Sequence, residues 1–185
     1  ERVSKNLKIK TVEFTSTKAV KPYVKPVFDL INKTYTEIYG FTKLTEDEMT
    51  EFAERFLPLL NPKLIKMITD ENGELLAFII AMADLSEAIK NSRGRILPFG
   101  WARILWAMKT SKRLQLLLGA IHPNYQNKGL DAVLATMLFG SALKLGFKTV
   151  DSHLIMKDNL KMRGEIEKLE GFNLYKEYCI FRKKL

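Results

Sequence analysis

A polar turn with a single glycine stands directly before an apolar stretch in His122–Leu138, HPNYQNKGLDAVLATML. The first N–H groups of a helix have no partners within the helix, and partial positive charge gathers there. Gly129 has no Cβ and permits close approach to the backbone, while Gln126 and Lys128 add side-chain donors. These features predict an anion site, with phosphate the natural ligand. The alternative is a strand-to-helix turn that only caps itself.

Groups that could move a proton lie near the ends of predicted strands. They are Asp84, Glu87, Asp151, His153 and Asp158. His153 is the first candidate for a general base because its unperturbed pKa of about 6.5 suits proton transfer near neutrality. A buried, hydrogen-bonded histidine is the other interpretation. Tyr175 and Tyr178 lie on the last predicted strand, where each could donate a proton or serve only in packing.

The composition is that of a folded globular protein, with 46% hydrophobic and 28% charged residues among 185. The longest apolar run, Leu75–Ala83, is far shorter than the roughly 18 residues that a membrane-spanning helix needs. One cysteine and two histidines offer neither a disulfide nor the spacing of a zinc site, so we expect no metal. A lone cysteine fits a reducing compartment, and we expect a cytoplasmic protein.

The net charge of +9 should attract anions such as nucleic acid, acidic lipid or a phosphorylated cofactor. The basic residues are dispersed, with local clusters at Lys5–Lys10, Lys109–Arg113 and Arg182–Lys184. A nucleic-acid surface would interleave aromatic residues with clustered lysine and arginine, and no such stripe is present. Nucleic acid is therefore not the expected partner.

Hydrophobic periodicity predicts the elements that must position these groups. The first half should contain a strand over Leu7–Phe14 and a helix over Tyr23–Tyr39 that ends at Gly40. A second helix should open with a capping box formed by Thr45 and Glu48. Two apolar strands should then follow, joined by a tight turn at Asn72-Gly73.

In the second half, an insert over 85–112 should hold a helix at Ser86–Asn91 and another that contains Trp101 and Trp106. On that second helix, one face with the spacing of a core should consist of Trp101, Ile104, Leu105 and Met108. Next come a strand, RLQLLLGAI, and the helix after the turn, whose apolar stripe consists of Leu130, Val133, Leu134, Met137 and Leu138. A strand in KTVDSHLIM, a helix over Asn159–Leu169 and one or two strands in FNLYKEYCIFRKKL complete the chain. This order predicts a single α/β domain over 1–185, with a mixed sheet of six to seven strands and helices on both faces.

The chain resembles the GNAT superfamily of acetyl-CoA-dependent N-acyltransferases, whose signature is Gln/Arg-x-x-Gly-x-Gly/Ala between the fourth strand and the third helix. The matching residues here, QNKGLD, are Gln126, Asn127, Lys128, Gly129, Leu130 and Asp131. The resemblance implies that their N–H groups hold the pyrophosphate of acetyl-CoA or another acyl-CoA. It also implies that the preceding strand bonds the pantetheine through Gly119, Ala120 and Ile121. Asn159 matches the asparagine that opens the next helix of the family, and Arg163 either meets a cofactor phosphate or lies in solvent.

Longer stretches resemble one branch of that superfamily. GRILPFGWARIL, LLLGAIHPNYQNKGLDAVL and MKDNLKMRGEIEKLEGFNLYKEYCIF look like the second half of tandem two-lobed GNAT-like proteins of bacteria. The resemblance implies the insert and a preceding lobe, which would fit a chain that begins at Glu1. A homodimer is the other assembly to consider.

The sequence departs from the family pattern at two positions. Asp131 replaces the last small residue of the signature, which suits a first helical turn but would repel a bound pyrophosphate. Ile166 stands where many members place a proton-donating tyrosine, seven residues beyond the asparagine. Two functions therefore follow: acyl transfer to a small-molecule amine, with His153 and Tyr178 as catalytic candidates, or a catalytically silent lobe. Trp101 and Trp106 would line an acceptor or acyl pocket, or pack in the core.

Overall fold

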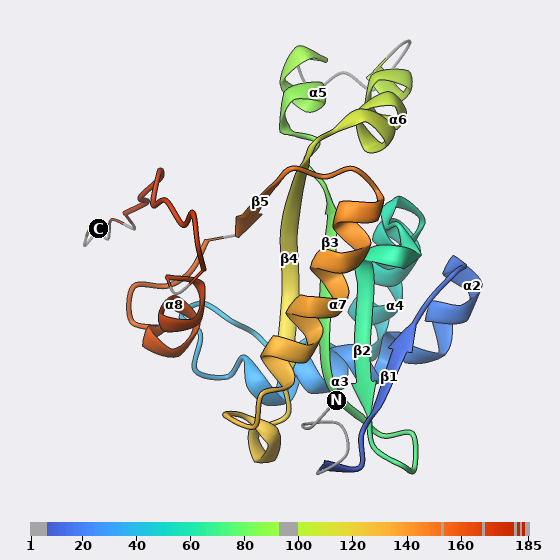
Figure 1. The fold of residues 1–185 in the computed structure, drawn as a ribbon, viewed down its shortest axis with the longest axis vertical. Helices are drawn as coiled ribbons and strands as arrows, with labels where there is room; N and C mark the ends of the chain where they lie inside the picture. The colour runs from blue at the N-terminus through green and yellow to red at the C-terminus, as the bar shows by residue number, and fades with distance from the viewer. Residues whose placement is uncertain are drawn as a thin grey trace. The chain divides into compact units, whose positions relative to one another are not determined.

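A computed structural model describes residues 7–92, 100–152, 154–167, 169–179, 181 and 183. The chain divides into two compact units, residues 1–153 and 154–185. The first unit holds one mixed sheet in which neighbouring strands follow chain order (Figure 1). Its strands are β1 (Lys10–Glu13), β2 (Ile65–Thr69), β3 (Leu75–Ala83), β4 (Arg113–Ile121) and β5 (Thr149–Ser152). Strands β1 to β4 pair antiparallel, and β5 runs parallel to β4.

The predicted strand count was too high, because the described residues contain five strands rather than six or seven. The strands expected at the end of the chain are absent over residues 172–179, which have no regular secondary structure. An alternating sequence forms a strand only where another backbone supplies hydrogen-bond partners. Within the described part of the second unit, the regular element is α8 (Leu160–Ile166), and no strand is present for those residues to pair with.

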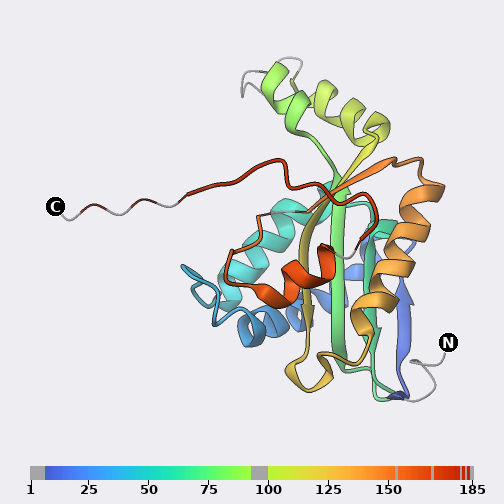
Figure 2. The ribbon, with the colours of Figure 1, turned by 60° about the vertical axis from the view of Figure 1, so that its left-hand side comes forward.

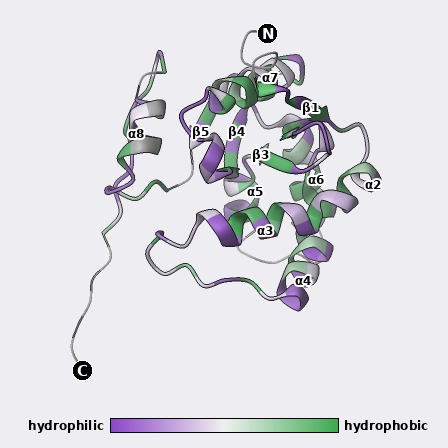
Figure 3. Ribbon diagram, turned by 90° about the horizontal axis from the view of Figure 1, so that it is seen from below, coloured by the Kyte–Doolittle hydropathy of each residue, from purple (hydrophilic) through white to green (hydrophobic). Residues whose placement is uncertain are grey.

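The helix α7 (Leu130–Lys144) covers one face of the sheet, opposite α3 (Val24–Thr34) and α4 (Glu46–Phe56) (Figure 3). Its buried residues recur at every fourth position: Leu130, Leu134, Leu138 and Ala142. The predicted apolar stripe is therefore confirmed, and Val133 packs at its margin. The buried Lys66 side chain of β2 donates to Ser141 Oγ at 2.7 Å and pairs with Glu13, which ties α7 to the sheet.

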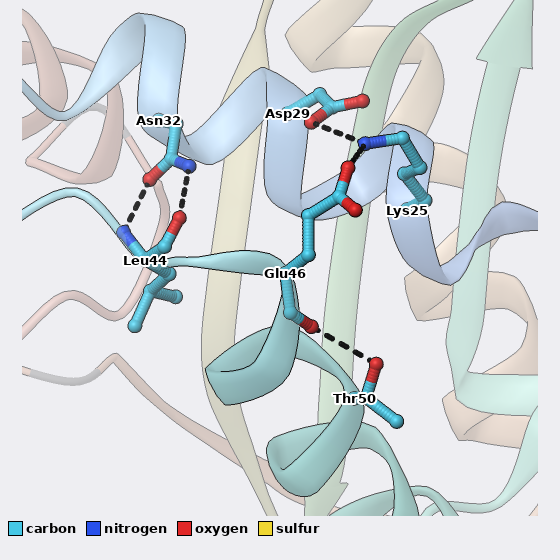
Figure 4. Close-up of polar contacts among 6 residues, drawn as sticks. All are labelled: Lys25, Asp29, Asn32, Leu44, Glu46 and Thr50. Atoms are coloured by element: carbon cyan, nitrogen blue, oxygen red, sulfur yellow. Dashed lines mark hydrogen bonds and ion pairs between the residues drawn. The ribbon is translucent and has the colours of Figure 1, made fainter.

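The opposite layer is held together by polar contacts between α3 and α4 (Figure 4). The Asn32 amide accepts from the N–H of Leu44 and donates to its carbonyl, both at 2.9 Å. Lys25 Nζ lies 2.6 Å from Glu46 Oε1 across the same junction. Together these contacts join both ends of α3 to the start of α4 and the residues just before it.

The predicted caps and turns of the first half are largely confirmed. The Thr45–Glu48 capping box opens α4, and Gly73, with φ +88°, lies in the tight turn between β2 and β3. The helix predicted over 23–39 is shorter than expected, since α3 ends at Thr34. Tyr35 leaves the helical conformation and its hydroxyl bonds to β4, a tertiary contact that the periodicity did not contain.

The short elements α2 (Thr17–Val20), η1 (Lys21–Tyr23), η2 (Leu57–Leu59), η3 (Pro62–Leu64) and η4 (Pro123–Tyr125) fill the connections. Two helices, α5 (Ser86–Asn91) and α6 (Gly100–Thr110), stand between β3 and β4 in sequence, as predicted. They project from the end of the sheet (Figure 2). Residues 93–99, which fall within the predicted insert, lie outside the described residues.

Core packing of Trp101 and Trp106 was a wrong interpretation. Their exposed fractions are 51% and 70%. Helix α6 contacts α5 and β3 with the side that carries Gly100, Ile104 and Met108. The side that carries the two tryptophans is left uncovered by the described residues. The spacing was typical of a core, but the helix that carries it is packed on one side only.

Candidate functional site

The turn after β4 has the backbone conformation that its sequence requires. It consists of η4, then Gln126, Asn127 and Lys128, and Gly129 is the N-cap of α7 with φ +82°. This left-handed conformation costs a residue with a Cβ about 1–2 kcal/mol, which explains the glycine. Asn127 is also left-handed, with φ +59°, and asparagine is one of the few residues that tolerate this region.

The N–H groups of this turn point to an anion-binding role. Gln126 N–H donates to Pro123 O at 3.4 Å, and Val133 N–H donates to Gly129 O at 3.2 Å. Between them, the N–H groups of Asn127–Asp131 have no acceptor among the residues that the structure describes. Such groups at the start of a fifteen-residue helix need water or a ligand to satisfy them. The geometry therefore fits a phosphate group.

Positive charge lies close to the same turn. Lys128 Nζ sits 5.1 Å from the centre of the Tyr125 ring, and Lys33 Nζ from α3 lies 2.7 Å from His122 Nε2. His122 Nδ1 accepts the N–H of Asn124 at 3.2 Å, which fixes the imidazole at the end of β4. Asp131 is half-buried in the first turn of α7 and makes no ion pair within the described part of the chain. Two lysines and one carboxylate thus lie at or beside this turn.

One edge of β4 is open beside the turn. Pairing between β4 and β5 runs from Arg113–Thr149 to Leu116–Ser152 and extends no further among the described residues. The other edge of β4 stays paired with β3 as far as Ile121. Gly119, Ala120 and Ile121 therefore lie where β4 has lost its parallel neighbour, and this is the stretch assigned to pantetheine by resemblance.

Tyr35 occupies part of that open edge and was missed as a site residue. Its hydroxyl donates to Gly119 O at 2.9 Å and lies 3.4 Å from Gly119 N. Burial raises the pKa of the Tyr35 phenol above its usual value, and the contact with Gly119 partly offsets this effect. No separate signal marks Tyr35 in the sequence, because it falls on the apolar spacing of the helix predicted there.

The candidate bases predicted from the sequence lie in different environments. Asp84 accepts the N–H of Ser86, the first residue of α5, at 2.9 Å and lies 3.6 Å from Arg113. Glu87 and Asp158 are exposed, and Asp151 is half-buried on β5. His153, the first candidate, lies outside the described residues.

Four residues singled out in the sequence belong to the second unit. The Asn159 side chain accepts the N–H of Met162 at 3.1 Å and so caps α8. Arg163 donates to Glu167 Oε1 through Nε at 3.1 Å and Nη2 at 2.9 Å. Ile166 is buried, and Tyr178 is exposed on an irregular segment. The cofactor-binding roles of Asn159 and Arg163 stay predictions.

No protein-family model matches the chain. Among curated proteins, it is 24% identical over 168 residues to the bacterial ceramide synthase of Caulobacter vibrioides, covering 88% of this chain and 43% of that protein. It is 27% identical over 164 residues to protein YghO of Escherichia coli, covering 85% of this chain and 41% of that protein. The chain thus spans about two fifths of the length of these relatives.

Several solved structures share the fold. A complex of AAC(6')-Iy with a CoA-linked bisubstrate analogue has a TM-score of 0.58 at 13% identity, covering 96% of this chain and 99% of that one. An aminoglycoside acetyltransferase from an uncultured soil sample, solved with sisomicin, has a TM-score of 0.57 at 14% identity and coverages of 97% and 99%. An N-acetyltransferase of Staphylococcus aureus has a TM-score of 0.55 at 13% identity and coverages of 86% and 81%. The chain therefore has the fold of the GNAT superfamily of acetyltransferases.

Proposed function

We propose that this chain is an N-acyltransferase lobe that transfers an acyl group from an acyl-CoA to an amine. The observation that carries the proposal is the row of N–H groups from Asn127 to Asp131, which have no acceptor among the described residues and lie at the start of α7 in a GNAT fold. A diphosphate would accept from several of these groups, and Lys33 and Lys128 would add attraction.

The bound acyl-CoA would supply an acyl group activated as a thioester. The open edge of β4 at Gly119–Ile121 is the proposed place for its pantetheine arm. The Tyr35 hydroxyl already contacts both backbone groups of Gly119. It must therefore release at least one of these groups before the pantetheine can bond there. Acyl transfer then needs a neutral amine and a protonated leaving thiolate. His153 and Tyr178 remain the proposed base and acid, with Asn159 and Arg163 as further cofactor-binding residues.

One of the curated relatives supports a particular class of substrate. A ceramide is an amide between a fatty acyl group and a long-chain amino alcohol, and one relative is a ceramide synthase. We therefore propose long-chain amines as the first acceptors to test and fatty acyl-CoA beside acetyl-CoA as donors. Since the chain spans about two fifths of both relatives, the proposal includes a preceding lobe in a longer protein.

Calorimetry with CoA, acetyl-CoA and palmitoyl-CoA (below its micelle concentration) tests cofactor binding. Lys128→Gln at the turn should weaken binding several-fold, whereas Lys144→Gln, an exposed lysine at the other end of α7, should not. Release of free thiol on adding a long-chain amine then tests transfer. No CoA binding at millimolar ligand would remove the proposal.

A catalytically silent lobe is the second candidate, and two observations favour it. The Tyr35 hydroxyl is hydrogen-bonded to the backbone groups of Gly119, and Asp131 places a negative charge beside the N–H groups of the turn. This function predicts that CoA either fails to bind or binds without thiol release from any donor and amine. Turnover by the 185-residue chain would exclude it.

A further inference from the structure

Helix α6 presents an apolar stripe to the outside. Trp101, Leu105 and Trp106 have exposed fractions of 51%, 49% and 70%. At about 100° per residue, Leu105 lies about 40° from Trp101 around the helix and Trp106 lies about 100° beyond Leu105, so the three exposed side chains cover one broad side of α6. Together with Ile89 of α5, which is 51% exposed, we call them the α6 stripe.

The stripe is held in place by the adjoining side of the helix, which packs on α5 and β3. Ile104 and Met108 face inward, and Arg103 Nη1 donates to Asn91 O at 2.8 Å, which joins α6 to the end of α5. The pair projects from the end of the sheet, as Figure 2 shows. A large apolar surface on a projecting element is typical of an interaction site.

Basic residues border the stripe. Lys90, Lys109 and Lys112 are exposed on or directly after these helices, and the exposed Lys148 is linked to Lys112 by a backbone hydrogen bond of 2.7 Å. The acids nearby are Glu87, which is exposed, and Asp84, which pairs with Arg113. The border is therefore positive, and the complementary surface is anionic.

Among the described residues, no helix is both long and apolar enough to cross a bilayer. We infer that the α6 stripe docks on the surface of an anionic phospholipid bilayer. Tryptophan favours the interface between headgroups and acyl chains, and lysine favours the anionic headgroups. With eleven residues, α6 is about 16 Å long and would lie in the plane of the interface.

Docking would orient the rest of the first unit. Strand β4 begins three residues after α6 and ends at Ile121, just before the turn at Gln126–Asp131. Nine residues of strand span about 30 Å, so the turn would face away from the bilayer, toward water-soluble ligands. Docking does not require acyl transfer, so either proposal can fail alone.

Intrinsic fluorescence tests the inference directly, because Trp101 and Trp106 are the only two tryptophans of the sequence. Vesicles of phosphatidylcholine with phosphatidylglycerol should shift tryptophan emission to the blue, and brominated acyl chains should quench it. Vesicles of phosphatidylcholine alone should have a much smaller effect. Replacing Lys109 or Lys112 by Gln should weaken vesicle binding by about five-fold each. Lys18→Gln, an exposed lysine on α2, should leave binding unchanged.

Vesicle sedimentation supplies a readout without tryptophan. The double variant Trp101→Ser, Trp106→Ser should lose binding, whereas Phe52→Ser, which alters a 46% exposed aromatic on α4, should retain it. An unchanged emission spectrum with anionic vesicles, or equal sedimentation of the double variant, would overturn the inference. So would a concentration-dependent dimer that the double variant abolishes, since the stripe would then bind a second copy.

Discussion

The two ends of β4 differ in what they leave unsatisfied. At the end of the strand, Tyr125 of the turn packs against the cluster that contains Leu130, and the N–H groups from Asn127 to Asp131 have no acceptor in the described part of the chain. Before the start of β4, the backbone groups of α6 are hydrogen-bonded within the helix, and the exposed groups are apolar side chains instead. Unpaired N–H groups attract an anion, whereas exposed tryptophans attract an apolar or interfacial partner. One strand thus separates two surfaces with opposite chemistry.

The largest expected effect compares a leucine from each region. Leu130 is 0% exposed at the start of α7, and Leu105 is 49% exposed on α6. Leu130→Ala should lower the free energy of unfolding by about 2–5 kcal/mol because it leaves a cavity. Leu105→Ala should change it by about 0.5 kcal/mol or less. Urea unfolding followed by far-UV circular dichroism measures both, and equal losses would mean that α6 is packed on both sides.

The next test compares two glycines of α7, one at the left-handed N-cap position and one inside the helix. Gly129→Ala places a Cβ in the left-handed region and should cost about 1–2 kcal/mol. Gly140 lies inside α7, where an added Cβ would meet no atom within 4 Å. Gly140→Ala should therefore stabilise the chain by about 0.5–1 kcal/mol. Thermal unfolding midpoints should move in opposite directions, and a stable Gly129→Ala variant would show that the turn can relax.

Tyr35→Phe tests whether the open edge of β4 is closed by its own side chain. Loss of the hydroxyl removes the bond to Gly119 O and should cost about 0.5–1.5 kcal/mol. It also frees both backbone groups of Gly119, so CoA should bind more tightly if the pantetheine uses them. Tyr23→Phe is the matched control, since the Tyr23 ring packs on Phe14 and its hydroxyl has no partner among the described residues. Weaker CoA binding by Tyr35→Phe would instead give Tyr35 a direct role in holding the ligand.

The stability of the Tyr35→Phe variant should also depend on pH in a different way from that of the unmodified chain. Because burial raises the pKa of Tyr35, the folded chain keeps this hydroxyl protonated at a pH where the unfolded chain, with a pKa of about 10, has begun to ionise. Its contribution to stability is complete below about pH 10 and is lost as the pH rises through the folded pKa. Unfolding measured from pH 8 to 11 should show a smaller alkaline loss for Tyr35→Phe than for Tyr23→Phe. Identical slopes would contradict the burial of the phenol.

The sequence predicted most elements that position the turn because their signals are local. The capping box at Thr45, the hairpin at Gly73 and the stripe on α7 each depend on neighbours within a few residues, and each is confirmed. The early end of α3 and the role of Tyr35 depend on β4, 84 residues away. Periodicity within one helix carries no information about such a contact.

Exposure was the second property that periodicity could not supply. The spacing of Trp101, Ile104, Leu105 and Met108 was interpreted as one buried face, but only Ile104 and Met108 face inward. An apolar helix face is the same in sequence whether a sheet or a bilayer covers it. The final strands failed for a related reason, because alternation over residues 172–179 does not reveal whether a partner strand exists.

The smallest expected effect concerns Asp131, the one acid at the turn. Its charge favours the positive end of α7 by about 0.3–1 kcal/mol, so Asp131→Asn should destabilise the chain slightly. The same charge opposes a bound diphosphate by about 1 kcal/mol or less across water, so CoA affinity should rise by about five-fold or less. Screening acts on this term, and the gain should shrink between 0.01 and 0.5 M salt. Calorimetry at both salt concentrations measures it, with Asp29→Asn on α3 as the control. An affinity that does not change would place the carboxylate away from the anion, and Asp131 would then be no argument for a silent lobe.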